Sequence, residues 1–341
     1  MSHRLEYLAL PGTSPGTSRQ LPVHRFGTAG ARPKAYLQAA LHADELPGML
    51  VLRHLLHRLF AADTAGRISG EIVVVPMANP IGLDQQLLGR HIGRFETAGG
   101  ENFNRHYLRL SDRAAVLVEG KLGADAAANV AAVRGALLQL LAGEQAVGEL
   151  AGLRLALLRL AIDADIVLDL HCEQEAVLHL YTGTDLWPAA ADLVGDLGCR
   201  ACLLAAESGD DPFDEAFSGI WWRLAERFAG CAPVPKDTCL SATVELRGQA
   251  DVDETLAGQD AANLFRFLTR RGVIRGQAAS LPPVPCAATP LAGVDMIRSP
   301  AAGIVVFRQA VGAMVKAGDV LAELVDPADD PRKAPLELRS R

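Results

Sequence analysis

Apolar positions follow two different periods along the chain, and these periods predict alternating strands and helices. Residues 34–41, 71–76 and 166–171 are nearly continuous apolar runs, which are typical of strands buried on both faces of a sheet. Between the first two runs, residues 46–60 carry apolar side chains at helical spacing. The order strand, helix, strand predicts an α/β fold with a mixed, mostly parallel sheet flanked by helices.

The remaining segments extend this pattern. Residues 114–160 are rich in Ala and Leu and predict two or more packing helices. Further strands are expected at 21–26, 177–181 and 241–246, and further helices at 186–195, 217–228 and 260–271. The rest of residues 11–33 and the stretch 89–105 are expected to be loops. Loops that leave the carboxyl ends of parallel strands commonly build binding sites.

The composition changes at a Pro-rich linker, residues 281–285. Beyond it, residues 299–324 predict short strands separated by Gly turns, and this part resembles a biotinyl/lipoyl-type barrel. The Met-Lys-Met hairpin that carries the cofactor in such barrels is absent, so we expect no attached prosthetic group. Residues 329–341 are expected to form a polar tail. The predicted division is an N-terminal loop and short strand (1–33), a main domain (34–280) and a small all-β domain with its tail (281–341).

Composition and charge narrow the classes of function. Half of the residues are hydrophobic and the formal net charge is -7, so no basic surface for nucleic acid is expected. No apolar run approaches the roughly 20 residues of a membrane span, and the N-terminus lacks the layout of a signal peptide. The six cysteines lack the paired C-x-x-C spacing of a structural zinc site. We therefore expect a cytoplasmic protein with reduced thiols and neither nucleic acid nor a membrane as partner.

Two of the predicted strands are followed by candidate metal ligands. His42 and Glu45 come after the first apolar run in a His-x-x-Glu spacing, and His171 ends the third run. Two imidazoles and a carboxylate would leave a zinc ion one open position, as catalysis requires. Alternatively, Glu45 favours the positive end of the following helix and His171 bonds a neighbouring loop. Asp169 shares a strand face with His171 and is a candidate to orient its imidazole.

Other residues offer the remaining parts of a hydrolase site. Glu245 lies near the end of an apolar strand, where it is either a general base or the partner of Arg247 in an ion pair. His179 and Tyr181 share one face of a strand and are candidates to line the pocket.

The expected loop at residues 89–105 contributes arginine side chains and an amide to the candidate site. Arg94 or Arg90 could stabilise developing negative charge, and Asn104 with Arg105 is suited to gripping a substrate carboxylate. Exposed, solvated arginines are the alternative interpretation.

Taken together, four motifs carry a resemblance to a known family. His42–Glu45, Asn102–Arg105, Asp169–Cys172 and Val244–Gly248, in this order, resemble the succinylglutamate desuccinylase/aspartoacylase family, a branch of the zinc carboxypeptidase-like enzymes. The resemblance runs through most of residues 34–275 and extends to the small β domain. It implies one zinc ion per chain held by His42, Glu45 and His171. It also implies Glu245 as general acid/base, Arg94 as oxyanion stabiliser, and Asn104 with Arg105 as binders of the substrate carboxylate.

One departure from the family pattern concerns Asn102, where many members have Asp, and it puts an acidic supporting residue there in doubt. Residues 171–181 look closest to a bacterial subgroup that includes N-acetyl-diaminobutyrate deacetylases. The expected function is zinc-dependent removal of an acetyl, succinyl or aspartyl-type acyl group from a small N-acyl amino acid, in a chain that could form a homo-oligomer. The alternatives are a zinc carboxypeptidase for small peptides, whose site the β domain would cap, and a non-catalytic metal-binding scaffold.

Overall fold

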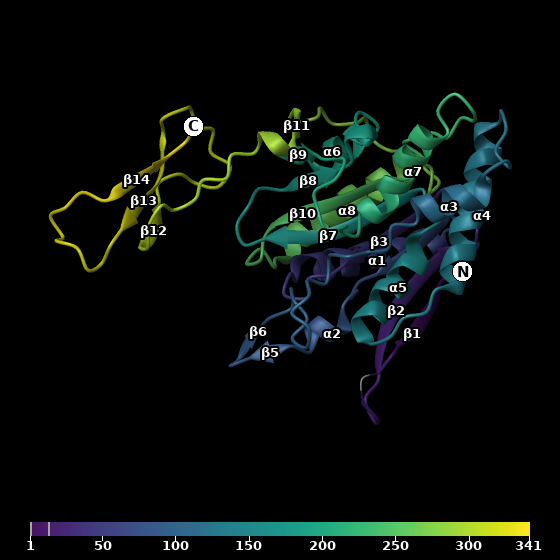
Figure 1. The fold of residues 1–341 in the computed structure, drawn as a ribbon, viewed down its shortest axis with the longest axis horizontal. Coiled ribbons are helices and arrows are strands. Elements are labelled where there is room, and N and C mark those ends of the chain that lie inside the picture. The colour runs from purple at the N-terminus through teal and green to yellow at the C-terminus, as the bar shows by residue number, and fades with distance from the viewer. Residues whose placement is uncertain (1, 13) are drawn as a thin grey trace.

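A computed structural model describes residues 2–12 and 14–341 (Figure 1). Met1 and Thr13, the latter in the predicted N-terminal loop, lie outside the described residues. The strands are β1 (Arg4–Leu10), β2 (Arg19–Gly27), β3 (Lys34–Ala39), β4 (Glu71–Val75), β5 (Gln86–Leu87), β6 (Arg90–His91), β7 (Ile166–Glu173), β8 (His179–Thr182), β9 (Ala201–Leu204), β10 (Leu240–Gly248), β11 (Ala288–Pro290), β12 (Ile304–Phe307), β13 (Val320–Val325) and β14 (Leu336–Arg339). The helices are α1 (Pro47–Thr64), α2 (Pro80–Leu83), α3 (Ser111–Val118), α4 (Ala126–Gly143), α5 (Glu149–Ala161), α6 (Ala191–Leu197), α7 (Glu215–Arg227) and α8 (Glu254–Arg270), with 3₁₀ turns η1 (Thr184–Leu186) and η2 (Leu291–Gly293).

The large sheet confirms the predicted α/β fold. Its nine strands follow the order β1-β2-β4-β3-β7-β10-β8-β9-β11. The central strands β4, β3, β7 and β10 are parallel to one another. Strand β8 is antiparallel to β10, and β2 is antiparallel to β4. The carboxyl ends of β3, β7 and β10 therefore meet at one edge of the sheet.

Helices cover both faces of this sheet, and the central strands are apolar on both faces for that reason. On β3, Tyr36 packs into one core with α3, α4, α5 and α7, whereas Ala35 and Leu37 pack into a second core with α1, α6 and α8. Val73 and Val74 of β4 divide in the same way. This alternation follows from the two-residue period of a strand.

The N-terminal segment contains more structure than its sequence predicts. The predicted strand at 21–26 is the centre of β2, which is longer, and β1 pairs with it in an antiparallel hairpin. The sequence analysis missed β1 because it is an edge strand whose Leu5 and Tyr7 are exposed, so no apolar run marks it.

Other helices and strands begin or end at residues different from those predicted. The predicted helix at 186–195 is a 3₁₀ turn followed by the shorter helix α6, because Pro188 interrupts the segment. The helix predicted from residue 260 begins at Glu254, where Asp253 caps it by accepting bonds from the N–H groups of Thr255 and Leu256. Strand β9 was not predicted, since its four residues are too few to show a period.

The C-terminal part contains the predicted small β structure. Strands β12, β13 and β14 form an antiparallel sheet to one side of the main sheet (Figure 1). The prediction of a polar tail was wrong at 336–339, because β14 pairs there with β13. Strand β11 pairs with β9 and so attaches the segment after the Pro-rich linker to the large sheet. The three-part division of the chain stays a prediction.

Helix α4 bears on the expectation that no segment of the chain spans a membrane. Among the described residues, α4 is long and apolar enough, by length and composition alone, to cross a membrane. In this fold Val133, Leu137 and Leu141 of α4 pack in the core, and Arg134 forms an ion pair with Asp165. One side of α4 therefore lies in the core, and 28% of its residues are buried.

Candidate active site and metal centre

The predicted site residues meet at the carboxyl edge of the central strands. In the strand register, Glu245 of β10 lies between His171 of β7 and His179 of β8, and Thr243 lies between Asp169 and Tyr181. Side chains two residues apart on a strand share a face. The edge thus presents two rows of polar side chains, and the loop after β3 brings His42 and Glu45 alongside them.

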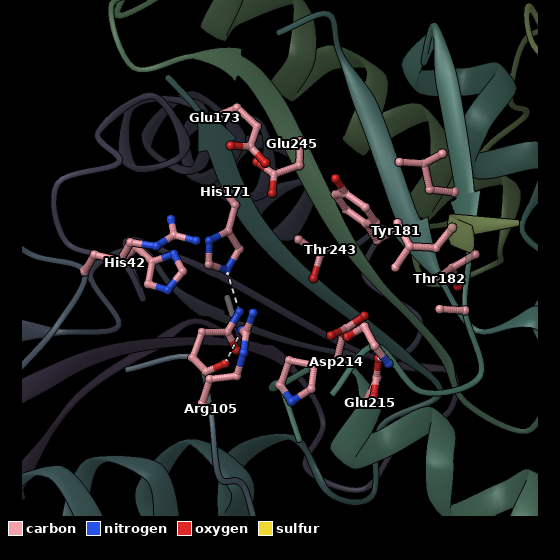
Figure 2. A pocket seen from close by; sticks show the side chains of 17 residues that line it. His42, Arg105, His171, Glu173, Tyr181, Thr182, Asp214, Glu215, Thr243 and Glu245 are labelled. Carbon is pink, nitrogen blue, oxygen red and sulfur yellow. Dashed lines mark hydrogen bonds between the residues drawn. The ribbon is translucent and has the colours of Figure 1, made fainter. Parts of the chain in front are cut away.

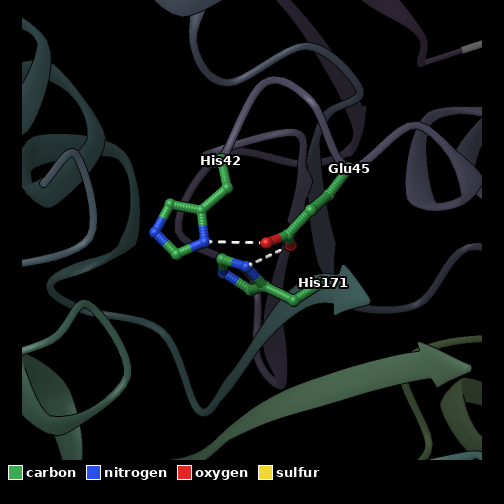
Figure 3. Close-up of side chains that lie close together, drawn as sticks. All are labelled: His42, Glu45 and His171. Atoms are coloured by element: carbon green, nitrogen blue, oxygen red, sulfur yellow. Dashed lines mark hydrogen bonds and ion pairs between the residues drawn. The ribbon is translucent and has the colours of Figure 1, made fainter. Parts of the chain in front are cut away.

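His42, Glu45 and His171 form a compact buried cluster (Figure 3). Glu45 Oε1 lies 2.9 Å from His42 Nδ1, and Glu45 Oε2 lies 2.8 Å from His171 Nδ1. One candidate ligand atom from each residue lies within 4.8 Å of the other two. The backbone N–H of Cys172 donates to Glu45 Oε2 at 3.1 Å and helps to fix the carboxylate.

The far nitrogens of both imidazoles are held by other residues. Asn102 Oδ1 lies 2.8 Å from His42 Nε2 and also accepts from the backbone N–H of Asn104. Asp169 Oδ2 lies 2.8 Å from His171 Nε2 at ion-pair distance. An amide oxygen and a carboxylate oxygen only accept, so both contacts favour a proton on Nε2 and leave Nδ1 as the ligand atom when a metal is bound. The doubt about Asn102 is thereby answered, since its amide oxygen takes the place of an acid.

This arrangement fits a divalent metal ion. Two imidazole nitrogens and a carboxylate converge on one point, which is a ligand set that suits a divalent cation. Although burial opposes it, Asp169 and Glu45 hold the pKa of His171 well above its usual value, which reflects an environment that favours positive charge. Against its own burial, the two imidazoles hold the pKa of Glu45 far below its usual value. His42, Glu45 and His171 therefore form a candidate metal site.

Glu245 lies beside this cluster in a different environment. Its side chain is 8% exposed, and Oε2 has no hydrogen-bond partner among the described residues. Burial raises the pKa of Glu245 to about 8, with Glu45 and Glu173 adding to the effect against the influence of His171. The alternative ion pair with Arg247 does not form, because Arg247 pairs with Asp260. A buried carboxylate with a free oxygen is suited to proton transfer.

Arg94 and not Arg90 reaches the cluster. Arg94 Nη1 donates to Glu45 Oε1 at 3.0 Å, whereas Arg90 lies in β6 with an exposed side chain. Gly93 brings the loop close, because its carbonyl accepts from the N–H of Ala43 and an added Cβ would lie 2.5 Å from the backbone nitrogen of Asp44. The remaining guanidinium N–H groups of Arg94 are available to a ligand.

Asn104 and Arg105 both line the pocket, but they are held differently. Asn104 is buried, its Oδ1 accepts from the N–H of Phe213, and its Nδ2 lies 3.5 Å from His171 Nε2. Arg105 Nη1 donates to the carbonyl of Asn104 at 2.6 Å, which orients its guanidinium along the cavity wall. The buried amide of Asn104 thus supports the site, and the guanidinium of Arg105 supplies a positive charge at the cavity wall.

The cavity measures about 300 Å³ (Figure 2). Tyr181 lines the cavity, whereas His179 packs edge-on against Tyr181 and lies near Glu173 and Glu245. The residues that line the cavity are His42, Arg94, Asn104, Arg105, His171, Glu173, Tyr181, Thr182, Leu203, Ala205, Ser208, Pro212, Asp214, Glu215, Thr243, Glu245 and Leu291. Its small volume suits a small molecule.

Two acidic residues of the wall were missed in the sequence. Asp214 is buried at the start of α7, and burial raises its pKa to about 7, with Glu215 and Asp169 adding to the rise. Glu215 lies beside it and accepts from the N–H of Ser208 at 2.7 Å. Neither residue ends an apolar run, so the pattern that indicated His171 gave no signal here.

The C-terminal segment reaches the cavity at a single place. Leu291 of η2 lines the wall, and none of the other described residues after it does so. The contribution of this part of the chain to the pocket therefore comes from the segment next to β11 and not from the β12–β14 sheet.

Comparison with known proteins connects this geometry to a family. Residues 31–130 match the model of the succinylglutamate desuccinylase/aspartoacylase catalytic domain. Among curated proteins, none matches the chain.

Several solved structures share the fold over nearly the whole chain. A succinylglutamate desuccinylase/aspartoacylase family protein from Shewanella amazonensis is 29% identical, with a TM-score of 0.86 over 99% of this chain and 91% of that one. A second such protein, from Shewanella frigidimarina, is 23% identical, with a TM-score of 0.83 and the same two coverages. The ectoine utilization protein EutE (DoeB) from Ruegeria pomeroyi is 18% identical, with a TM-score of 0.66 over 99% of this chain and 87% of that one. The family-model match over residues 31–130 and the similarity to the Shewanella amazonensis protein confirm the resemblance to the succinylglutamate desuccinylase/aspartoacylase family that the four motifs predicted.

Proposed function

We propose that this protein is a zinc-dependent amidohydrolase that deacylates a small N-acyl amino acid. The observation that carries the proposal is the cluster of His42, Glu45 and His171 beside the buried carboxylate of Glu245, whose Oε2 has no hydrogen-bond partner among the described residues. Zinc bound by the three ligands would supply a Lewis acid that polarises the scissile carbonyl and acidifies the attacking water. The family match and the small cavity support an amide substrate of limited size.

The residues of the chain divide the remaining work. Glu245 accepts a proton from the attacking water and delivers it to the amine nitrogen as the C–N bond breaks. The free N–H groups of Arg94 donate to the oxygen that gains negative charge. Arg105 binds the carboxylate of the amino acid, and the backbone carbonyl of Asn104 keeps the guanidinium of Arg105 in place.

This proposal does not specify the acyl group or the amino acid of the substrate. It also does not assign the chain to the N-acetyl-diaminobutyrate deacetylase subgroup or specify whether the chain forms a homo-oligomer. The proposal places the enzyme in the cytoplasm with a small molecule as its partner. The net charge of -7 supports the exclusion of nucleic acid.

A substrate panel tests the proposal against a small-peptide carboxypeptidase. N-acetyl, N-succinyl and N-aspartyl-type amino acids are compared with dipeptides of the same amino acids, and each acyl compound is matched by an acyl amine that lacks the carboxylate. We expect turnover of one or more acyl amino acids and a large loss for the matched amines, because Arg105 then lacks its partner. Hydrolysis of the dipeptides alone would favour the peptidase. No turnover of any compound by zinc-loaded protein would favour a scaffold.

A further inference from the structure

A second group of potential ligands lies next to the first, formed by Glu173, His179 and Glu245. One ligand atom from each residue lies within 4.8 Å of the other two. Glu245 is paired in register with both His171 and His179, so the two groups share adjacent positions on one sheet edge. Figure 2 shows the carboxylates of Glu173 and Glu245 directed toward one another.

The histidine of this group is prepared to act as a ligand. His179 is 7% exposed, and its Nδ1 lies 2.8 Å from the carbonyl oxygen of Val177. Because a carbonyl only accepts, Nδ1 carries the proton and the lone pair is on Nε2. A hydrogen bond of this kind from the far nitrogen is what orients metal-binding histidines.

The carboxylates of Glu173 and Glu245 would be stabilised by a bound cation. Two carboxylates within this distance repel one another, and Glu245 Oε2 is buried without a partner among the described residues. An unpaired buried polar atom costs free energy that a bound ion would recover. Glu173 is exposed, which gives an ion a route from solvent. Two carboxylate oxygens and one imidazole nitrogen suit a divalent transition ion.

We propose that Glu173, His179 and Glu245 form a second divalent-cation site, weaker than the first, whose occupation inhibits the enzyme. An ion held by Glu245 removes the oxygen that accepts the proton in the proposed reaction. The same protein would then be active with one equivalent of metal and inhibited by excess. The inhibition rests on the proposed function, whereas the binding site does not.

Metal titration of the full-length apoprotein tests the site without reference to activity. Cobalt(II) or zinc is added to the wild type, and binding is followed by calorimetry and by the cobalt absorption spectrum. We expect two classes of site with a stoichiometry of one each. Glu173→Gln should weaken only the second class, by roughly tenfold or more, since even the partners of metal ligands contribute 10–100-fold. Glu175→Gln is the matched control, because Glu175 is an exposed carboxylate outside the group.

The two metal sites are separated by further variants. His42→Ala should lose the first class and keep the second. Two classes of bound metal in a wild type that hydrolyses no compound of the substrate panel would overturn the proposed function without affecting the second binding site. Excess zinc should inhibit the wild type and Glu175→Gln, and inhibit Glu173→Gln much less relative to its own activity at one equivalent. A single binding class in the wild type, or a second class of equal affinity in Glu173→Gln, would overturn the inference.

Discussion

Two neighbouring groups of side chains on one sheet edge differ in how their polar atoms are paired. In the first group, both oxygens of Glu45 face imidazoles, and the far nitrogens of those imidazoles face Asn102 and Asp169. In the second group, Glu245 keeps one oxygen without a partner among the described residues. Pairing fixes a group in position, whereas an unpaired oxygen is available for a proton or an ion. The difference separates residues that hold a metal from a residue that performs chemistry.

The largest effect expected from breaking the pairing concerns Asn102 and Asp169. Asn102→Ala or Asp169→Asn should lower the affinity for zinc by roughly 10–100-fold, because each releases one imidazole from its fixed orientation. Competition with a chromophoric chelator measures the affinity. Asp185→Asn serves as a control, since that carboxylate pairs with Lys236 away from the cavity. Wild-type zinc affinity in both variants would show that the pairing is irrelevant to metal binding.

A smaller effect is expected from Asp214, which resembles Glu245 in being a buried acid of the cavity wall. Ser218 and Ser241 donate to the backbone carbonyl of Asp214 and not to its carboxylate. Burial raises the pKa of Asp214 from 3.8 to about 7, so the folded state holds a proton between these values that the unfolded state releases. Stability should therefore fall as pH rises from about 4 to 7.

Urea unfolding at pH 5 and pH 8 measures this contribution. Asp214→Asn cannot ionise, so its free energy of unfolding should change less between the two pH values than that of the wild type, by about 1–2 kcal/mol. An identical pH dependence in the two proteins would show that Asp214 ionises as freely in the folded state as in the unfolded state.

The smallest effect is expected at Leu291, which tests how the C-terminal part affects the pocket. Leu291→Ala removes apolar surface from the cavity wall and should raise KM by a few fold, since each buried methylene contributes about 0.8 kcal/mol. Leu336→Ala, on β14 outside the cavity, should leave KM unchanged. A larger change in KM for Leu336→Ala than for Leu291→Ala would indicate that the β12–β14 sheet itself covers the site.

The sequence predicted the parts of the fold that are apolar on both faces. Strands β3, β4 and β7 appear as continuous apolar runs because helices cover both sides of them. Strand β1 was missed because its side chains are largely exposed, and β14 because its residues are as polar as a tail. A strand at an edge depends on pairing with its neighbour, which a single segment does not reveal.

The candidate metal ligands were predictable because each follows a recognisable strand. His42, Glu45 and His171 needed only the rule that carboxyl ends of parallel strands meet. Asp214 and the distinct position of His179 were not predictable, since they depend on how α7 and β8 pack against β10. The choice of Arg94 over Arg90 likewise required the close approach of Gly93 to Ala43.

The most direct test of the central claim measures metal content and turnover on the same dialysed preparations of wild type, Glu245→Gln and His42→Ala. The account predicts that Glu245→Gln keeps one tightly bound zinc ion and loses about 10²–10⁴-fold of kcat, because only the proton acceptor is removed. His42→Ala should lose the zinc and the activity together. Near-normal turnover in Glu245→Gln, or full zinc content in His42→Ala, would contradict the division between a metal-holding group and a proton-accepting residue.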